Sequence, residues 1–378
     1  MTVRFPSLDL RSLLIVLFAF IGNAQVFGLD LVLVLVAPAL LALILTTPSK
    51  LPSRSYFPYL VLAITLFVAM LQAIHVAVPY FDDYYIWPLK AFILMTFVVF
   101  IGPSRWTITN MFALSLVVLA LILMGNIESG RLHSAFGPNM LYRLFGMLAF
   151  FSAMQGFQPS RGNRLTTAAM FGLGAIGLVL TGSTGAIVVA TAIMVLYLYR
   201  LSLRVFLCLV IGSAGIVILS ITQTDASVLA LLHDSKLPII ARAFYKLGTW
   251  QDEARMIGLI TLFTEPFSIL GHQHADFANL WSFGYVYPHN IFAELYAFYG
   301  ITGLIIIVAI LLTIRKLTMV AMLSDVYFMT FIILLIGANL SGDLSDNYGV
   351  VGLAGGLLLR AGQTARRRKR GVPEGAAL

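Results

Sequence analysis

Apolar runs separated by short polar stretches make up most of this chain. Most runs are about 20 residues long, which is the length that an α-helix needs to cross a bilayer core. A transmembrane β-barrel would show shorter segments of alternating polarity. The pattern therefore predicts an all-α polytopic membrane protein with about twelve transmembrane helices (ten to twelve). The predicted spans lie at approximately residues 11–27, 29–47, 56–78, 84–102, 107–125, 138–156, 165–181, 183–200, 203–222, 288–313, 322–341 and 347–361.

One long polar segment, residues 223–287, interrupts this pattern and predicts a large external loop. The stretch that begins at Thr249 resembles a capping box and predicts a helix to about residue 264. Residues 227–235 and 239–247 have the pattern of short amphipathic helices at the membrane interface. A loop packed on the helical bundle explains these two pieces equally well.

Charged residues change sign between successive short loops. Basic residues lie in the N-terminal segment, in every second loop and in the tail: Arg4, Arg11, Lys50, Arg54, Arg105, Arg161, Arg164, Arg200, Arg204, Arg315, Lys316 and residues 366–370. Acidic residues lie in the intervening loops: Asp30, Asp82, Asp83, Glu128, Asp343 and Asp346. Because basic loops stay in the cytoplasm, both termini are predicted to be cytoplasmic, with residues 362–378 as a basic tail. The first span is predicted to be a retained helix, since the sequence after it is a weak signal-peptide cleavage site.

The composition agrees with this class and excludes others. Hydrophobic residues are 60% of the chain and the mean hydropathy is +0.95, so a soluble domain could not bury the apolar surface. The net charge of +8 comes from the loops and the tail, a pattern that orients membrane proteins and does not indicate nucleic-acid binding. The tail is expected to rest on anionic headgroups or to stay in the cytoplasm. The single cysteine, Cys208, allows no intrachain disulfide. No repeat, linker, phosphate-binding loop or HExxH motif is present, and residues 1–378 are predicted to form one membrane domain.

Two arginines of the external loop are candidate ligands of an anion. Arg255 falls in the first turn of the predicted loop helix, where free N–H groups and the helix dipole favour an anion. A guanidinium there adds bidentate contacts to a phosphate. A salt bridge to Asp252 or Glu253 is the alternative. Arg242 forms a basic pair with Lys246, suited to lipid headgroups or to an anionic substrate.

The sequence Pro288-His289-Asn290 leads from the external loop into the next span. Proline is favoured at the first helical position, which would put His289 and Asn290 at the outer N-terminus of this helix. The helix dipole there disfavours imidazolium and keeps the ring neutral, as a general base requires. An interfacial histidine without a catalytic role is the alternative.

A shorter outer loop runs from Arg131 to Asn139, ahead of another helix that begins with proline, and Arg143 lies one turn further along. An arginine near the end of a span must snorkel, pair with a carboxylate or face a wet cavity. Glu294, in the span after the large loop, is a candidate partner, as are two acidic residues of the last outer loop.

Other polar residues allow two interpretations each. His272, His274 and Asp276 have a spacing that can bind zinc when a further ligand converges. On a glycine-containing loop a structural or substrate-lining role is favoured, and no metal is predicted. Lys90 and His75 are ionisable residues inside predicted spans, and Lys90 either snorkels to the interface or has a function.

Four segments together resemble the O-antigen ligase and O-antigen/exopolysaccharide polymerase superfamily of bacterial envelope enzymes. They are RLHSAFGPN at 131–139, LTGSTGA at 180–186, RMIGLITLFTEPFSILG at 255–271 and HNIFAELYAFYGITG at 289–303. Their order and spacing, the number of spans and the large outer loop are similar to the family pattern over most of the chain. Thr184 departs from it, since the family often has arginine in that turn.

The resemblance implies a metal-independent glycosyltransferase with no cofactor and a GT-C-like membrane fold. It implies that the substrate is an undecaprenyl-diphosphate-linked glycan at the outer face of the bacterial inner membrane. By position, Arg255 and Arg131 would hold the diphosphate and His289 would activate the acceptor hydroxyl, with Arg242 as a weaker candidate for a second loop arginine. Four further residues are expected to bind substrate: Asn139, Arg143, Asn290 and Glu294. A chain-length regulator or a flippase is the expected protein partner.

Two alternatives remain at this stage. A polymerase and an O-antigen ligase share these motifs and differ in the acceptor, which is another lipid-linked repeat or the lipid A core. Polymerase is favoured because such polymerases are the more numerous group. A multi-span transporter of an anionic solute would also suit ionisable residues inside spans, although the sequence shows no two-half repeat.

Overall fold

The structure is a computed structural model, and it describes residues 9–21, 25–26, 29–30, 34, 37–45, 56–76, 84–102, 104, 106–128, 131–133, 138–156, 164–181, 186, 189–193, 265–273, 276, 290–317, 321, 325–339 and 344–369. Regular structure in these residues is almost entirely helical. The chain divides into two compact units. The α6 unit comprises Met1–Ser7 and Thr107–Thr261, and the α17 unit comprises Leu8–Trp106 and Leu262–Leu378.

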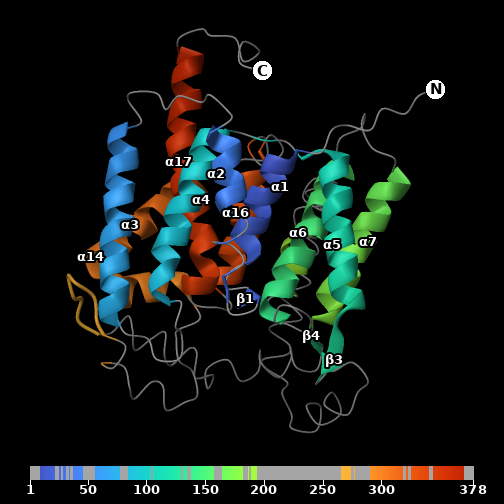
Figure 1. The fold of residues 1–378 in the computed structure, drawn as a ribbon, viewed down its shortest axis with the longest axis horizontal. Helices are drawn as coiled ribbons and strands as arrows, with labels where there is room; N and C mark the ends of the chain where they lie inside the picture. Colours follow the sequence, from blue (N-terminus) through green and yellow to red (C-terminus); the bar gives the residue numbers. More distant parts are fainter. Residues whose placement is uncertain are drawn as a thin grey trace, which may run out of the picture. The chain divides into compact units, whose positions relative to one another are not determined.

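The α17 unit contains the larger set of helices (Figure 1). Its elements are α1 (Leu10–Ile21), β1 (Gln25–Val26), β2 (Leu29–Asp30), α2 (Ala37–Leu45), α3 (Tyr56–Val76), η3 (Tyr84–Ile86), α4 (Trp87–Ile101), α14 (Ile291–Ile314), α16 (Val326–Ala338) and α17 (Leu344–Lys369). The two short strands form an antiparallel hairpin.

Helix α17 is the centre of its unit and packs most extensively on α4, with α14, α16 and α1 also against it. Its glycines allow this close packing. A Cβ on Gly352 would lie 2.8 Å from the carbonyl oxygen of Ala91 in α4, and a Cβ on Gly356 would lie 2.6 Å from Val98. Small residues at a helix interface let two backbones approach closely, as is common where helices associate in lipid.

Polar contacts join one set of helix ends in the α17 unit. Buried Asp325, the N-cap of α16, forms an ion pair with buried Arg360 of α17. Arg360 also donates to the carbonyl of Gly102 at the end of α4, at 2.8 Å. The hydroxyl of Ser104 donates to Asp9, just before α1, at 2.7 Å. These four helix ends were predicted to lie on the same side of the membrane, so the contacts agree with the predicted alternation of helix directions.

Helix α3 presents an apolar stripe on its exposed face. The exposed residues recur at intervals of three and four: Phe57, Leu60, Ile64, Phe67, Leu71 and Ile74. A water-facing helix would carry polar residues there, whereas a lipid-facing helix carries apolar ones. Within the described residues, α3, the η3–α4 segment and α14 are long and apolar enough to cross a membrane, and five further apolar helices are shorter. The protein is therefore a helical membrane protein in its described parts.

The α6 unit contains α5 (Ile108–Leu123), β3 (Asn126–Glu128), β4 (Arg131–His133), α6 (Pro138–Gly156) and α7 (Arg164–Leu180). Thr107 caps α5, its hydroxyl accepting from the N–H of Asn110 at 3.2 Å. Helices α6 and α7 pack along their length. Gly177 of α7 faces the ring of Phe145, and a Cβ there would lie 2.6 Å from it.

Several predicted boundaries agree closely with the observed helices, and others do not. Predicted spans at 56–78, 138–156 and 165–181 correspond to α3, α6 and α7. Where a span was predicted at 29–47, residues 29–30 form a strand and α2 begins at Ala37, because Pro38 favours the first turn of a helix over its interior. Helix α17 continues to Lys369, so the first part of the predicted tail, residues 362–378, is helical. The predicted span at 203–222 and the predicted loop helices at 227–264 lie outside the described residues.

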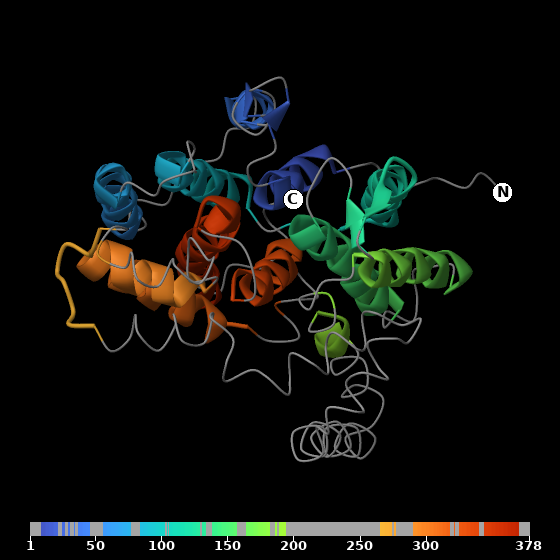
Figure 2. The same cartoon turned by 90° about the horizontal axis from the view of Figure 1, so that it is seen from below.

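Helix α14 is bent at Gly300. This residue has φ 49° and ψ −124°, which are not helical values and lie in a region that favours glycine. Gly303 then lies directly against the carbonyl oxygen of Leu295. In a straight helix eight residues span about 12 Å, so this contact shows how sharply the axis turns. Seen from below, α14 (orange) is viewed from the side, whereas α3 is viewed nearly end-on (Figure 2).

Candidate functional site

The candidate site lies where three helices of the α17 unit begin and a fourth ends. Helix α14 begins after Asn290, α17 begins at Leu344, α4 follows the short helix that begins at Tyr84, and α16 ends at Ala338 with Asn339 as its C-cap. Side-chain hydrogen bonds connect all four ends. Because the N-terminal ends of helices carry partial positive charge, their convergence favours a negative group nearby.

Asn290 is the N-cap of α14. Its side-chain oxygen accepts from the N–H groups of Phe292 and Ala293, both at 3.0 Å, and its amide nitrogen donates to Asn339 at 3.0 Å. Asparagine is among the strongest N-cap residues. Asn290 therefore lies at the N-terminus of this helix, as predicted, and His289 lies outside the described residues.

Glu294 is buried one turn below this cap, with about 1% of its surface exposed. Its Oε1 atom accepts a hydrogen bond from the Tyr84 hydroxyl at 2.7 Å and another from the backbone N–H of Leu344 at 3.1 Å. The carboxyl group thus caps the first turn of α17 from a neighbouring helix. A buried carboxyl is tolerated in an apolar span when such donors surround it.

Aromatic residues extend this polar cluster along α4. The indole N–H of Trp87 donates to the hydroxyl of Tyr299 at 2.7 Å, and the two rings meet edge to face at 5.3 Å. Lys90 is fully buried, with its ammonium 5.6 Å from the ring centre of Tyr348, a cation–π contact. Lys90 therefore does not extend to the membrane interface, and the snorkelling interpretation is excluded.

The α6 unit holds the residues of the shorter outer loop. Arg131 opens β4, and its backbone lies opposite that of Glu128 in the register of the hairpin. Helix α6 begins at Pro138, as predicted, and Asn139 is in its first turn. Arg143 is fully buried, with its guanidinium carbon 5.9 Å from the ring centre of Tyr142. These candidates share one unit, and their convergence with Glu294 stays a prediction.

The remaining candidates fall in the external loop. His289, Arg255 and Arg242 lie outside the described residues. His272 is described, and its Nε2 lies 3.0 Å from the carbonyl oxygen of Pro266, a contact that suits a structural role. Its Nδ1 lies 3.9 Å from Asp276, and no group of three histidine, cysteine, aspartate or glutamate residues comes together in the part of the chain that is described.

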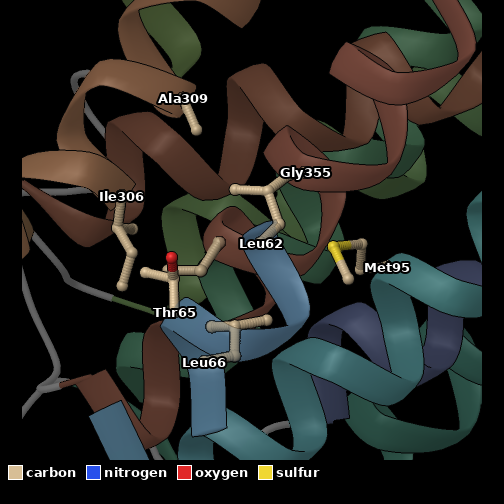
Figure 3. A pocket seen from close by; sticks show the side chains of 8 residues that line it. Leu62, Thr65, Leu66, Met95, Ile306, Ala309 and Gly355 are labelled. Carbon is tan, nitrogen blue, oxygen red and sulfur yellow. The ribbon is translucent and has the colours of Figure 1, made fainter. Parts of the chain in front are cut away.

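A recess in the α17 unit is apolar. It is lined by residues of α3, α4, α14 and α17, including Leu62, Thr65, Met95 and Ile306 (Figure 3). The hydroxyl of Thr65 donates to the carbonyl of Val61 in its own helix at 2.8 Å, so it offers no donor to a ligand. This recess does not supply acid–base chemistry.

Sequence analysis did not single out Tyr84 or Gln72. Tyr84 follows an acidic outer loop and opens the η3–α4 segment. The sequence shows that this residue lies at the start of a span, but it does not show the hydrogen bond to Glu294. Gln72 is the one amide side chain in the apolar helix α3, and an isolated amide in a span indicates an interhelical hydrogen bond. No known protein family, curated protein or solved structure matches this chain.

Proposed function

We propose that the protein is a membrane glycosyltransferase that polymerises undecaprenyl-diphosphate-linked oligosaccharide repeats of O-antigen or exopolysaccharide. In this proposal it has a GT-C-like fold of about twelve spans, with both termini in the cytoplasm and the 223–287 loop at the outer face. The observation that carries the proposal is the start of α14, where Asn290 caps the helix immediately after His289 and Glu294 lies one turn below.

The proposed reaction needs the protein to remove a proton from the acceptor and to stabilise the departing diphosphate. The acceptor hydroxyl oxygen attacks the anomeric carbon of the donor sugar, the bond from that carbon to the diphosphate oxygen breaks, and undecaprenyl diphosphate leaves with the electron pair. His289 takes the proton of the hydroxyl as general base. Arg255 and Arg131 stabilise the charge that develops on the diphosphate, with Arg242 as a further candidate.

The other candidates have supporting roles in this proposal. The hydrogen bonds of Asn290 and Glu294 engage helix ends, which suits residues that shape the substrate site more than residues that react. Asn139 and Arg143 would line the acceptor side from the first turns of α6. No metal or cofactor is needed, because the donor is already activated by its diphosphate.

The test is glycan chain length in cells that lack their own copy of the gene and are complemented with variants. Wild type should restore long polymer, whereas His289→Ala and Arg255→Ala should not, although both accumulate in the membrane. His233→Ala and Lys236→Ala, in the same loop, are the matched controls and should restore polymer. Accumulation of a single-repeat product would select polymerase over ligase. Normal glycan with both variants would refute the proposed catalytic residues.

The competing function is transport of an anionic solute. Fully buried Lys90, Arg143 and Glu294 in apolar helices are the observation that favours it, since such residues mark ion and substrate pathways in transporters. Glycan transfer by purified protein in liposomes without an ion gradient would reject transport. Loss of glycan formation when the ion gradient is collapsed would support transport.

A further inference from the structure

The bend of α14 is joined by backbone hydrogen bonds to the last part of the external loop. In an unbroken helix the N–H of Ile301 would donate to the carbonyl of Ala297, four residues earlier. Instead, the N–H of Ile301 donates to the carbonyl of Ile269 at 3.0 Å, and the carbonyl of Ala297 accepts from the N–H of His272 at 2.8 Å. Residues 268–272, the docking segment, thus replace both halves of one helical hydrogen bond.

Two glycines make this junction possible. Gly271 in the docking segment has φ 85°, and a Cβ there would overlap the carbonyl of Phe298. Gly300 at the bend has φ 49°, and a Cβ there would overlap the carbonyl of Ile269. The docking segment and the bend therefore meet backbone to backbone. Because an unsatisfied backbone group is costly in lipid, the bend depends on the docking segment.

Gln72 of α3 connects the two parts of the junction. Its side-chain nitrogen lies 3.0 Å from the carbonyl oxygen of Leu270 in the docking segment. The same nitrogen lies 3.4 Å from the carbonyl oxygen of Tyr299, just before the bend. One amide group thus donates to both the docking segment and the helix, from a third element.

We propose that Gln72 is a positioning residue that clamps the docking segment to the bend of α14 and thereby sets the direction of residues 291–299. This outer half of α14 carries Glu294 and starts at the Asn290 cap. Its effect on glycan transfer rests on the proposed function, whereas the clamp itself does not. A displacement of about 1 Å at a reacting group can lower a rate by about 10²-fold, so a small rotation of this half-helix is sufficient to slow the reaction.

The first test compares Gln72→Met with Thr65→Val. Methionine keeps the length of the side chain and suits a helix but donates no hydrogen bond. Thr65→Val also removes a polar group from α3, but the hydroxyl of Thr65 bonds to the carbonyl of Val61 within that same helix. We expect Gln72→Met to lower the rate of polymer formation by about tenfold or more, and Thr65→Val to leave it nearly unchanged. Equal rates for Gln72→Met and wild type would overturn the proposal.

The second test asks whether a covalent tie can replace the clamp. Cysteines are introduced at Ile269 and Ile301, whose side chains are both exposed, in a Cys208→Ser background, and joined by a short, reducible thiol cross-linker. We expect cross-linking to restore the rate of Gln72→Met and a reductant to remove the rescue. A structural defect elsewhere in the fold would not respond to this tie, and failure of the rescue would count against the proposal.

The cross-linking yield separates this proposal from the proposed function. If the pair joins readily with Gln72 present and less readily with Gln72→Met, the clamp stands even if wild type transfers no glycan. If the yield is the same with both residues, the clamp is refuted even if glycan transfer is confirmed.

Discussion

At the residue scale, Glu294 illustrates how a carboxyl group is accommodated in an apolar helix. It is enclosed by protein, and two donors from different elements converge on one of its oxygens. One of these donors is the first N–H of α17, a group that has no partner within its own helix. The carboxyl therefore satisfies a helix end that the local sequence of α17 leaves open.

This arrangement predicts a graded effect of substitution at Glu294. Glu294→Ala leaves the Tyr84 hydroxyl and the Leu344 N–H buried without this acceptor, and should lower the free energy of unfolding by about 2–4 kcal/mol. Glu294→Gln keeps an acceptor oxygen and should cost less. Tyr84→Phe removes one donor together with its need for a partner and should cost about 1 kcal/mol. Thermal unfolding in detergent measures all three, and an Ala variant as stable as the Gln variant would contradict the role given to Glu294.

Asp9 provides a pH-dependent contribution outside the predicted spans. Burial raises the pKa of its carboxyl, but hydrogen bonds from Ser104 and Ser12 lower it by more, so the pKa lies below its ordinary value of 3.8. A carboxyl with a lowered pKa stabilises the fold above its unfolded pKa and loses that contribution as the pH falls through the folded pKa.

We therefore expect the unfolding temperature to fall from about pH 4 downward, and the Asp9→Asn variant to show a smaller fall. Thermal scans between pH 6 and pH 3 would measure it, with Asp276→Asn as a control at an exposed carboxyl. The same acid dependence in Asp9→Asn and wild type would show that Asp9 does not contribute.

At the element scale, the bend in α14 decides how the candidate site is presented. The sequence around it, Tyr299-Gly300-Ile301-Thr302-Gly303, reads as the middle of a continuous 26-residue apolar span at 288–313. Glycine in a helix is a weak signal by itself, because many spans contain glycine without bending. The bend requires acceptors and donors from the docking segment, which are about thirty residues away in sequence.

Gly300→Ala should be strongly destabilising for this reason. A Cβ would be strained at φ 49° and would also overlap the carbonyls of Ile269 and Ser268, at a cost of at least about 2 kcal/mol. Gly172→Ala is the matched control, since it lies inside helix α7 with no atom within 4 Å of the added Cβ, and it should stabilise by about 0.5–1 kcal/mol. Unfolding curves in detergent compare the two, and a tolerated Gly300→Ala would show that α14 can straighten.

At the scale of the whole molecule, the alternation of loop charges predicts how the chain crosses the membrane. In the α17 unit, contacts gather Asp9, Gly102, Asp325 and Arg360 at one set of helix ends, and Tyr84, Glu294, Asn339 and Leu344 at the other. Each set contains ends that were predicted to share one side of the membrane. The direction of the chain across the membrane stays a prediction.

Cysteine labelling tests this orientation. In a Cys208→Ser background, Ser235→Cys in the large loop should react with a membrane-impermeant maleimide in intact spheroplasts. Gly371→Cys in the basic tail should react only after the membrane is permeabilised. Labelling of the tail before the loop would reverse the predicted orientation and would place the candidate site in the cytoplasm.

The sequence by itself determined the class of the protein and several of its helices, whereas the side of the membrane on which each loop lies stays a prediction. Helix-length apolar runs must form hydrogen-bonded helices in lipid, so α3, α6 and α7 could be predicted to within a few residues. Asn290 and Glu294 could be singled out because polar residues in such runs are costly. Tertiary structure alone decided which partners they have, because Tyr84 and Leu344 are 210 and 50 residues from Glu294. Tertiary structure also decided the bend at Gly300. The backbone groups that the bend frees from the helix are bonded by the docking segment and by Gln72, and the hydrophobic pattern of α14 gives no sign of these distant partners.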